Sequence, residues 1–225
     1  MCLNDNALCL AIYPQMNLLF DLDGTLTDPR RGIVGCIRYA LEQLHRDPDD
    51  YSNLERFIGP PLLESFVELL GSEKEARTAI DLYRVRFSTV GLFENEVYEG
   101  IENILSDLAA NGNRMVVATS KPRVFAVKII NHFNMNGYFD YVYGSELDGQ
   151  LSNKADLISF ILGKEGLDID TTLMIGDRSH DIVGAKKNAL RSVGVLWGYG
   201  SHDELTGAGA DILCDLPSQL IEHVT

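Results

Sequence analysis

The residues with the most evident chemical use are two aspartates, Asp21 and Asp23, in the run FDLDGT at residues 20–25. Asp21 directly follows an apolar segment, and a carboxylate placed there can attack phosphorus to form an aspartyl-phosphate. Asp23 can protonate the leaving oxygen and later accept a proton from the hydrolytic water. The pair therefore predicts phosphoryl transfer, with both residues in catalytic roles.

This run has two simpler interpretations. It could open a calcium-binding EF-hand loop, but that pattern needs Asp or Asn at its fifth place and Gly at its sixth, where Thr25 and Leu26 stand. The EF-hand is therefore nearly excluded. Asp-Gly is also common in ordinary turns, so the run alone does not distinguish a turn from a catalytic site.

Further polar residues follow other apolar segments of the chain. They are Thr119, Ser120 and Lys121 after residues 115–118, Lys154 after residues 139–143, and Asp177 and Asp181 after residues 173–175. Ligands of open parallel sheets bind beyond the carboxyl ends of the strands, so we expect these side chains to converge on the two aspartates. Singly, each could be a helix cap, a solvated lysine or an acid at a helix start. Their order along the chain favours one common site.

A convergent set of this kind requires a cation. Carboxylates crowded at one sheet edge repel each other unless a hard ion lies among them, and Mg²⁺ suits oxygen ligands. Mg²⁺ would also cancel charge between Asp21 and a phosphate dianion. We expect Thr119, Ser120 and Lys154 to bind the phosphate, with Lys121 in support.

The elements that would position these residues are short apolar runs alternating with segments of helical period. Strand-like runs occupy residues 18–20, 115–118, 139–143, 173–175 and 193–196. Helical stripes lie at residues 101–108, 122–133, 155–162 and 182–189. Continuous apolar strands separated by helices indicate a doubly wound, Rossmann-like α/β domain with a parallel sheet.

One stretch, residues 29–95, interrupts this alternation with helical pattern alone. It includes a capping-box sequence at residues 72–75, which predicts the start of a helix. We interpret residues 29–95 as a helical cap inserted after the first strand, and residues 17–28 with 96–225 as the α/β core. Residues 1–16 would be an N-terminal extension.

Charge and cysteine content restrict the partners. The chain has 33 acidic residues against 19 Lys plus Arg, a formal charge of -14, which disfavours nucleic acid and anionic membranes. The four cysteines show no metal-ligand spacing, and no basic flank precedes the apolar patch at residues 7–13. We therefore expect a cytoplasmic protein that acts on a small phosphorylated metabolite. The oligomeric state stays open, and a monomer is compatible with the sequence.

The chain resembles the haloacid dehalogenase superfamily of phosphatases from about residue 17 to residue 224. DLDGTLTD at 21–28 is similar to its first motif, ATSKP at 118–122 to its second, Lys154 to its third and GDRSHD at 176–181 to its fourth. The four motifs in order are nearly diagnostic of this superfamily, and they imply a phosphoric monoester hydrolase.

The resemblance also implies roles for individual residues. Asp21 would be the nucleophile and Asp23 the acid/base. Mg²⁺ would be held by Asp21, Asp177 and the backbone carbonyl of Asp23. The phosphate would contact Thr119 and Lys154, and Asp181 would support the metal side of the site.

Within the superfamily, FIGPPL at residues 57–62 is similar to a cap segment of the phosphoglycolate phosphatase-like group. The Gly-Pro-Pro sequence either fixes a loop before a helix or presents Arg56 and Gly59 to the substrate. Relatives with this segment include nucleotidases. We therefore expect a phosphoglycolate phosphatase-like enzyme, with a 5′-nucleotidase as the alternative. The other polar cap candidates, Arg38, Tyr83 and Arg84, cannot be placed from the sequence.

Other functions on this fold are less favoured. A phosphomutase also needs Asp21 and Asp23, but its usual cap pattern of Thr, His and Lys is not found at residues 29–93. A dehalogenase would not use an acid at position 23, and an ion-pump relative would carry Thr there. A binding protein that kept the fold would have lost at least one of the motifs.

Overall fold

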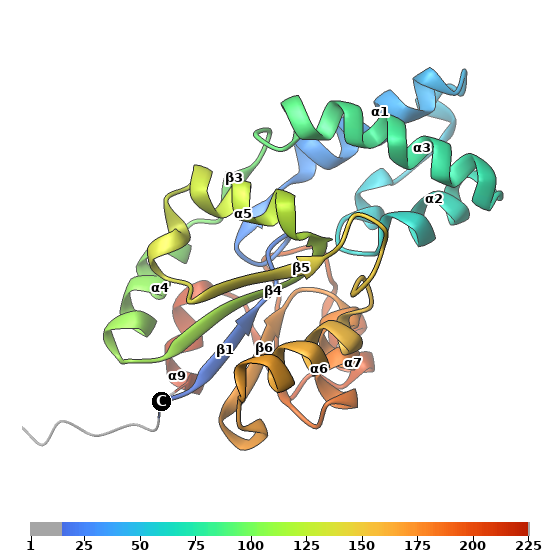
Figure 1. Cartoon of the computed structure of the whole chain (residues 1–225). Helices are drawn as coiled ribbons and strands as arrows, with labels where there is room; N and C mark the ends of the chain where they lie inside the picture. Colours follow the sequence, from blue (N-terminus) through green and yellow to red (C-terminus); the bar gives the residue numbers. More distant parts are fainter. Residues whose placement is uncertain (1–14, 225) are drawn as a thin grey trace, which may run out of the picture.

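A parallel β-sheet forms the centre of the computed structural model, which describes residues 15–224 (Figure 1). In this part of the chain six strands pair in the order β5-β4-β1-β6-β7-β8, all of them parallel. They are β1 (Asn17–Phe20), β4 (Arg114–Pro122), β5 (Tyr141–Ser145), β6 (Thr172–Gly176), β7 (Arg191–Val195) and β8 (Ile212–Cys214).

Helices cover both faces of this sheet. On one side lie α4 (Ile101–Ala110), α5 (Arg123–His132) and α9 (Leu220–Val224), and on the other α6 (Lys154–Glu165) and α7 (Ser179–Lys187). Leu18 and Phe20 of β1 pack into the first layer and Leu19 into the second, because strand side chains alternate between faces. This two-sided burial explains the continuous apolar run and confirms the predicted doubly wound α/β fold.

Some elements near the C-terminus escaped prediction. Strand β8 and helices α8 (His202–Ala208) and α9 are short, so they show too little periodicity to be recognised. The strand expected from residue 139 begins only at Tyr141, although the Asp140 N–H just before it already donates to the Met115 carbonyl of β4.

The predicted cap contains α1 (Arg30–Gln43), α2 (Leu62–Leu70) and α3 (Glu73–Arg86), which lie together beyond the ends of β4 and β5 (Figure 1). Short 3-10 turns at Pro48–Asp50 and Leu54–Phe57 and a π-helical turn at Phe87–Gly91 join and extend them. The side chain of Ser72 caps α3 by accepting from the Glu75 N–H at 3.4 Å. The Glu75 carboxylate pairs with Arg46 and does not accept from the Ser72 N–H, so only one of the two hydrogen bonds of the predicted capping box forms.

Two short strands, β2 (Thr27–Asp28) and β3 (Glu96–Val97), pair antiparallel where the predicted cap meets the predicted core. The chain thus leaves and returns through one narrow ribbon. Our division into a cap of residues 29–95 and a core of 17–28 with 96–225 stays a proposal, which this ribbon supports. Of the predicted extension 1–16, all but residues 15 and 16 lie outside the described residues. Among residues 15–224, no helix has the length and apolarity to cross a membrane.

The central strand offers a test of this packing. Leu19→Ala is expected to lower the free energy of unfolding by about 2–5 kcal/mol, because it opens a cavity between the sheet and α6. Urea unfolding measures the loss. The matched change Leu216→Ala, at a side chain 59% exposed, should cost less than about 0.5 kcal/mol. Equal losses at the two positions would contradict the burial of β1.

Candidate active site

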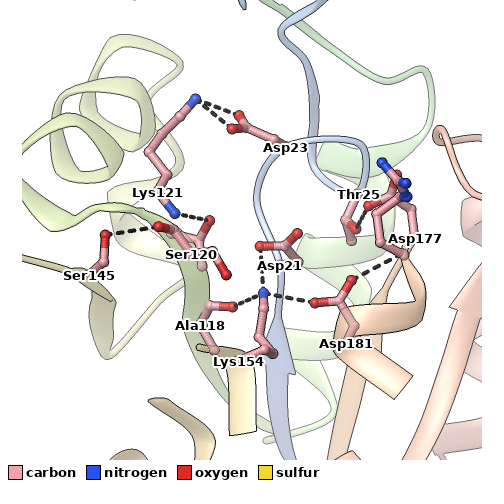
Figure 2. A network of polar contacts seen from close by, with 12 residues as sticks. Asp21, Asp23, Thr25, Ala118, Ser120, Lys121, Ser145, Lys154, Asp177 and Asp181 are labelled. Carbon is pink, nitrogen blue, oxygen red and sulfur yellow. Dashed lines mark hydrogen bonds and ion pairs between the residues drawn. The ribbon is translucent and has the colours of Figure 1, made fainter. Parts of the chain in front are cut away.

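The predicted site residues meet at the carboxyl ends of β1, β4 and β6, together with the first turns of α6 and α7 (Figure 2). Asp21 comes directly after β1, and its N–H donates to the carbonyl of Ile175 in β6 at 2.9 Å. Asp177 comes directly after β6. The pairing of β1 with both β4 and β6 therefore sets the distance between the motifs.

A buried lysine lies at the floor of the site. The Nζ of Lys154 lies 2.9 Å from Oδ1 of Asp21 and 2.7 Å from Oδ1 of Asp181, and it donates to the Ala118 carbonyl at 2.8 Å (Figure 2). Burial alone would lower the pKa of Lys154, but the two carboxylates outweigh burial and raise it. Lys154 is therefore a permanent ammonium group at the floor.

Three buried carboxylates gather beside this ammonium. Asp21, Asp177 and Asp181 each offer one oxygen, and these oxygens all lie within 4.8 Å of one another. Burial, with repulsion from Asp181 and Asp21, raises the pKa of Asp177 well above its usual range. Burial also raises the pKa of Asp181 to about 6, despite the attraction of Lys154. When all three are ionised, Lys154 balances only one of their negative charges, and their mutual repulsion contributes to the raised pKa values. The donor set therefore fits a hard divalent cation such as Mg²⁺.

Glycine allows the backbone to approach this cluster closely. Gly24 adopts φ +83°, and a Cβ at this position would lie 2.1 Å from Oδ2 of Asp177. A Cβ at Gly198 would lie 2.5 Å from the same oxygen. Gly24 of the first motif is thus required, because it lies so close to Asp177 of the fourth motif that no side chain fits between them.

The loop after β7 supplies contacts that sequence reasoning missed. The Tyr199 N–H donates to Oδ2 of Asp177 at 2.8 Å, and the Trp197 indole donates to the Thr25 carbonyl at 3.0 Å. The hydroxyl of Thr25 donates to Oδ1 of Asp177 at 3.5 Å. The repeated glycines at 198 and 200 were the available signal, since they indicate a close backbone approach.

Asp23 lies in a separate environment from the three-carboxylate cluster. Its two oxygens lie 2.7 Å and 2.6 Å from Nζ of Lys121, whose ammonium is also 4.9 Å from the ring centre of Phe87 in the predicted cap. Burial raises the pKa of Asp23, and Lys121 opposes that rise. Lys121, predicted as a supporting residue, thus holds Asp23 in place.

The predicted phosphate-binding hydroxyls lie next to Asp21 and Asp23. Thr119 is buried, and its Oγ1 accepts from the Lys121 N–H at 3.3 Å. Ser145 donates to the Ser120 carbonyl at 2.8 Å, which ties the end of β4 to the end of β5. Thr119 and Ser120 both face the cavity described next.

A cavity of about 500 Å³ lies between these residues and the predicted cap. Asp21, Asp23, Thr119, Ser120 and Lys121 line it from the sheet, and residues of the cap line the opposite wall. The cap residues include Phe57, Gly59, Pro60, Pro61, Arg77, Asp81, Tyr83, Arg84 and Phe87. The cavity therefore joins the candidate chemistry to a cap wall that is mostly apolar and aromatic, with a few charged side chains.

The cap candidates divide between this cavity and the surface. Gly59, Tyr83 and Arg84 line the cavity. The structure places Arg56 and Arg38 elsewhere: Arg56 pairs with Glu68 at 2.9 Å, and Arg38 pairs with Asp49 at 2.7 Å. Neither arginine lines the cavity, so neither would contact a substrate bound there in this conformation.

The comparisons with known proteins agree with this geometry. Residues 18–195 match the family model described as haloacid dehalogenase-like hydrolase, and the chain belongs to this family. A solved structure described as a predicted phosphatase from Clostridium acetobutylicum superposes with a TM-score of 0.90 and is 45% identical, covering 93% of this chain and 98% of that one. The chain is thus a phosphatase of this family, as its motifs predicted.

Curated relatives carry several names. A 5′-nucleotidase of Pseudomonas aeruginosa is 50% identical over 86% of this chain and 87% of its own length. A tyrosine-protein kinase, PtkA, of Mycobacterium tuberculosis is 37% identical over 84% of this chain but only 65% of its own length. A phosphoglycolate phosphatase of Caulobacter vibrioides is 27% identical over 92% of both chains. Family membership therefore does not by itself identify the substrate.

Two glycines with similar backbone angles test the contact with Asp177. Gly71→Ala, at φ +71° with nothing within 4 Å, should cost only the backbone strain of about 1–2 kcal/mol and leave phosphate release unchanged. Gly24→Ala adds a collision with Asp177, so it should cost more stability and lower phosphate release at least about 100-fold. Urea unfolding and a phosphate assay on both variants measure this. Similar activities would show that the contact is dispensable.

Proposed function

We propose that this protein is a Mg²⁺-dependent phosphatase that hydrolyses a small phosphate monoester through an aspartyl-phosphate on Asp21. The observation that supports this most directly is the arrangement of charges at the cavity floor. Asp21 faces the cavity beside the Lys154 ammonium. Asp23 also faces the cavity, but it is paired with a different cation, Lys121. A nucleophile and a proton donor in different environments are what a two-step hydrolysis needs.

The proposed hydrolysis has two steps. An oxygen of Asp21 forms a bond to phosphorus while the bond to the leaving oxygen breaks, and Asp23 donates its proton to that oxygen. Water then attacks the phosphorus, Asp23 accepts a proton from it, and the bond to Asp21 breaks to release phosphate. The raised pKa of Asp23, caused first by its burial, favours its protonated form in the first step.

The remaining residues would bind the phosphate and the cation. Mg²⁺, when bound, would neutralise negative charge on the phosphoryl group. Asp21, Asp177 and the main-chain carbonyl of Asp23 would hold it, and Asp181 would support this set from within the same cluster. The phosphate would be bound by Thr119 and Ser120 together with Lys154.

The cavity favours a substrate larger than phosphoglycolate. Its volume of about 500 Å³ falls within the usual range for small-molecule sites, and its aromatic lining suits a planar leaving group. Tyr83 and Phe87 stack with ring centres 5.3 Å apart along the cap side. Together with the 50% identical relative named 5′-nucleotidase, these features favour a nucleoside monophosphate. Phosphoglycolate, our first expectation from the sequence, becomes the second candidate.

We propose that the enzyme works in the cytoplasm on a free metabolite. The thiols of Cys36 and Cys214 are buried and unbridged, which is compatible with a reducing compartment. The excess of negative charge disfavours nucleic acid and membrane partners.

Removal of the cation tests the metal assignment without an activity assay. Saturating Mg²⁺, at about 100 times its dissociation constant, should stabilise the wild-type protein by about 2.7 kcal/mol relative to chelator. Asp177→Asn should lose most of this increment, because a buried ligand oxygen is replaced by an amide. Asp203→Asn, at a fully exposed carboxylate, should keep it. Thermal unfolding with and without Mg²⁺ measures this stabilisation. An equal Mg²⁺-dependent shift of the unfolding temperature in both variants would contradict the metal assignment.

The reaction itself is tested by phosphate release from nucleoside monophosphates, phosphoglycolate and sugar phosphates, each with Mg²⁺ and with chelator. We expect Mg²⁺-dependent release, with a higher kcat/KM for nucleoside monophosphates than for phosphoglycolate. Asp21→Asn should lower the rate at least about a thousandfold, because the amide is a poor nucleophile. Absence of Mg²⁺-dependent release from every substrate would refute the proposal, and isomerisation without phosphate release would indicate a phosphomutase.

A further inference from the structure

Arg178, the residue after Asp177, joins the sheet side of the site to the predicted cap. Its Nε donates to Oε1 of Glu204 at 3.0 Å, and its Nη1 donates to the Ile58 carbonyl and, at 3.4 Å, to the Arg56 carbonyl. The side chain is only 13% exposed. Arg178 thus bridges the fourth motif and the cap loop that precedes α2.

The cap loop is shaped to receive this side chain. Gly59 adopts φ +102°, and a Cβ at this position would lie 2.9 Å from Cγ of Arg178. Pro60 and Pro61, which follow, have no backbone N–H, so this part of the loop cannot be anchored through its own donors. The Ile58 N–H donates to the Glu55 carbonyl within the cap, and Arg178 reaches the loop through the carbonyl oxygens of Arg56 and Ile58. Gly59, Pro60 and Pro61 all line the cavity.

Arg178 is itself held in a defined orientation. Oε1 of Glu204 also accepts from the Ser179 N–H, at 2.8 Å. Burial acts to raise the pKa of Glu204, but hydrogen bonds from Ser179 and Arg178 overcome this and lower it. Glu204 therefore stays ionised, and its carboxylate fixes the guanidinium before any substrate arrives.

A second arginine crosses between the two sides in the opposite direction. Arg84 of α3 donates from Nη2 to the carbonyl of Leu147 at 2.7 Å, and Leu147 belongs to the loop after β5. Arg84 and Leu147 also line the cavity. We call these two arginine contacts clasps. The Arg178 clasp runs from the sheet side to the cap loop, and the Arg84 clasp runs from a cap helix to a loop on the sheet side.

We propose that Arg178 is a positioning residue that holds the cap loop 58–61 over the leaving group of the substrate, with Arg84 as the second clasp. This inference rests on the proposed phosphatase function. Gly59, Pro60 and Pro61 of this loop line the cavity, whereas phosphoryl transfer would take place at Asp21. The clasp therefore favours substrates whose leaving group is large enough to reach the loop.

The test compares Arg178→Met with Arg38→Met, which removes an arginine paired with Asp49 inside the cap. Amide hydrogen exchange in segment 54–62, measured at residues 54–59 and 62 because the two prolines have no N–H, should become about tenfold faster in Arg178→Met and stay unchanged in Arg38→Met. The KM for a nucleoside monophosphate should rise about tenfold, equivalent to about 1.4 kcal/mol. Turnover of acetyl phosphate, whose leaving group is small, should stay within about twofold.

The outcomes separate the clasp from the phosphatase proposal. Equal exchange of residues 54–62 in the two variants would overturn the clasp, and so would an equal loss of kcat on both substrates. Faster exchange in Arg178→Met without phosphate release by the wild type would support the clasp and refute the function. Should Arg178→Met fail to fold, Arg178→Lys keeps the charge but cannot reach Glu204 and Ile58 together, so it should show the same changes at smaller size.

Discussion

The contact of one buried ammonium group with two carboxylates, beside a third, is the interaction on which the rest of the structure depends. Lys154 touches Asp21 and Asp181, and Asp177 lies within reach of both. Charges removed from water interact strongly, and their desolvation is costly unless the geometry satisfies them. The four residues come from β1, β6, α6 and α7 or directly follow them, so the central sheet must hold these elements in register.

The order of the strands in the sheet holds these elements in register. Because β1 pairs with β4 on one side and β6 on the other, Asp21 and Asp177 follow neighbouring strands, and Thr119 lies within the last residues of β4, between them and β5, rather than after the strand as expected. Close approach then requires residues without a Cβ. At Gly176 a Cβ would lie 2.3 Å from Cγ of Asp181, and at Gly24 it would collide with Asp177. The glycines of the first and fourth motifs therefore have one shared cause, the crowding of carboxylates around Lys154.

The separation of Asp21 from Asp23 follows from the geometry of the strand end. Asp21 faces Lys154 at the floor, whereas Asp23 meets Lys121 under the ring of Phe87 from the π-helical turn of the predicted cap. Two carboxylates that are neighbours in sequence thus have different partners and different surroundings. A fold that places similar groups in different environments can use one as a nucleophile and the other as an acid. The cap contributes both to the enclosure of Asp23 and to the cavity wall.

The sequence by itself determined the parts of this protein that depend on local chemistry. Continuous apolar runs identified β1, β4 and β6, because a strand buried on both faces needs apolar side chains at successive positions. Polar residues directly after those runs identified Asp21, Asp23, Thr119 and Asp177 as neighbours, since parallel strands end at one edge. The start of α3 after Ser72 was likewise a local signal.

Only the tertiary structure decided which distant groups meet. Arg56 and Arg84 look equally suitable in the sequence, yet Arg56 pairs with Glu68 and Arg84 reaches the cavity. The contacts of Arg178 with Ile58 and of Tyr199 with Asp177 join segments 120 and 22 residues apart. Such pairings depend on the angles at which helices pack and loops close, and no local pattern encodes them. The side chains that we propose as catalytic can therefore be recognised in the sequence, whereas the cavity that encloses them is a product of packing.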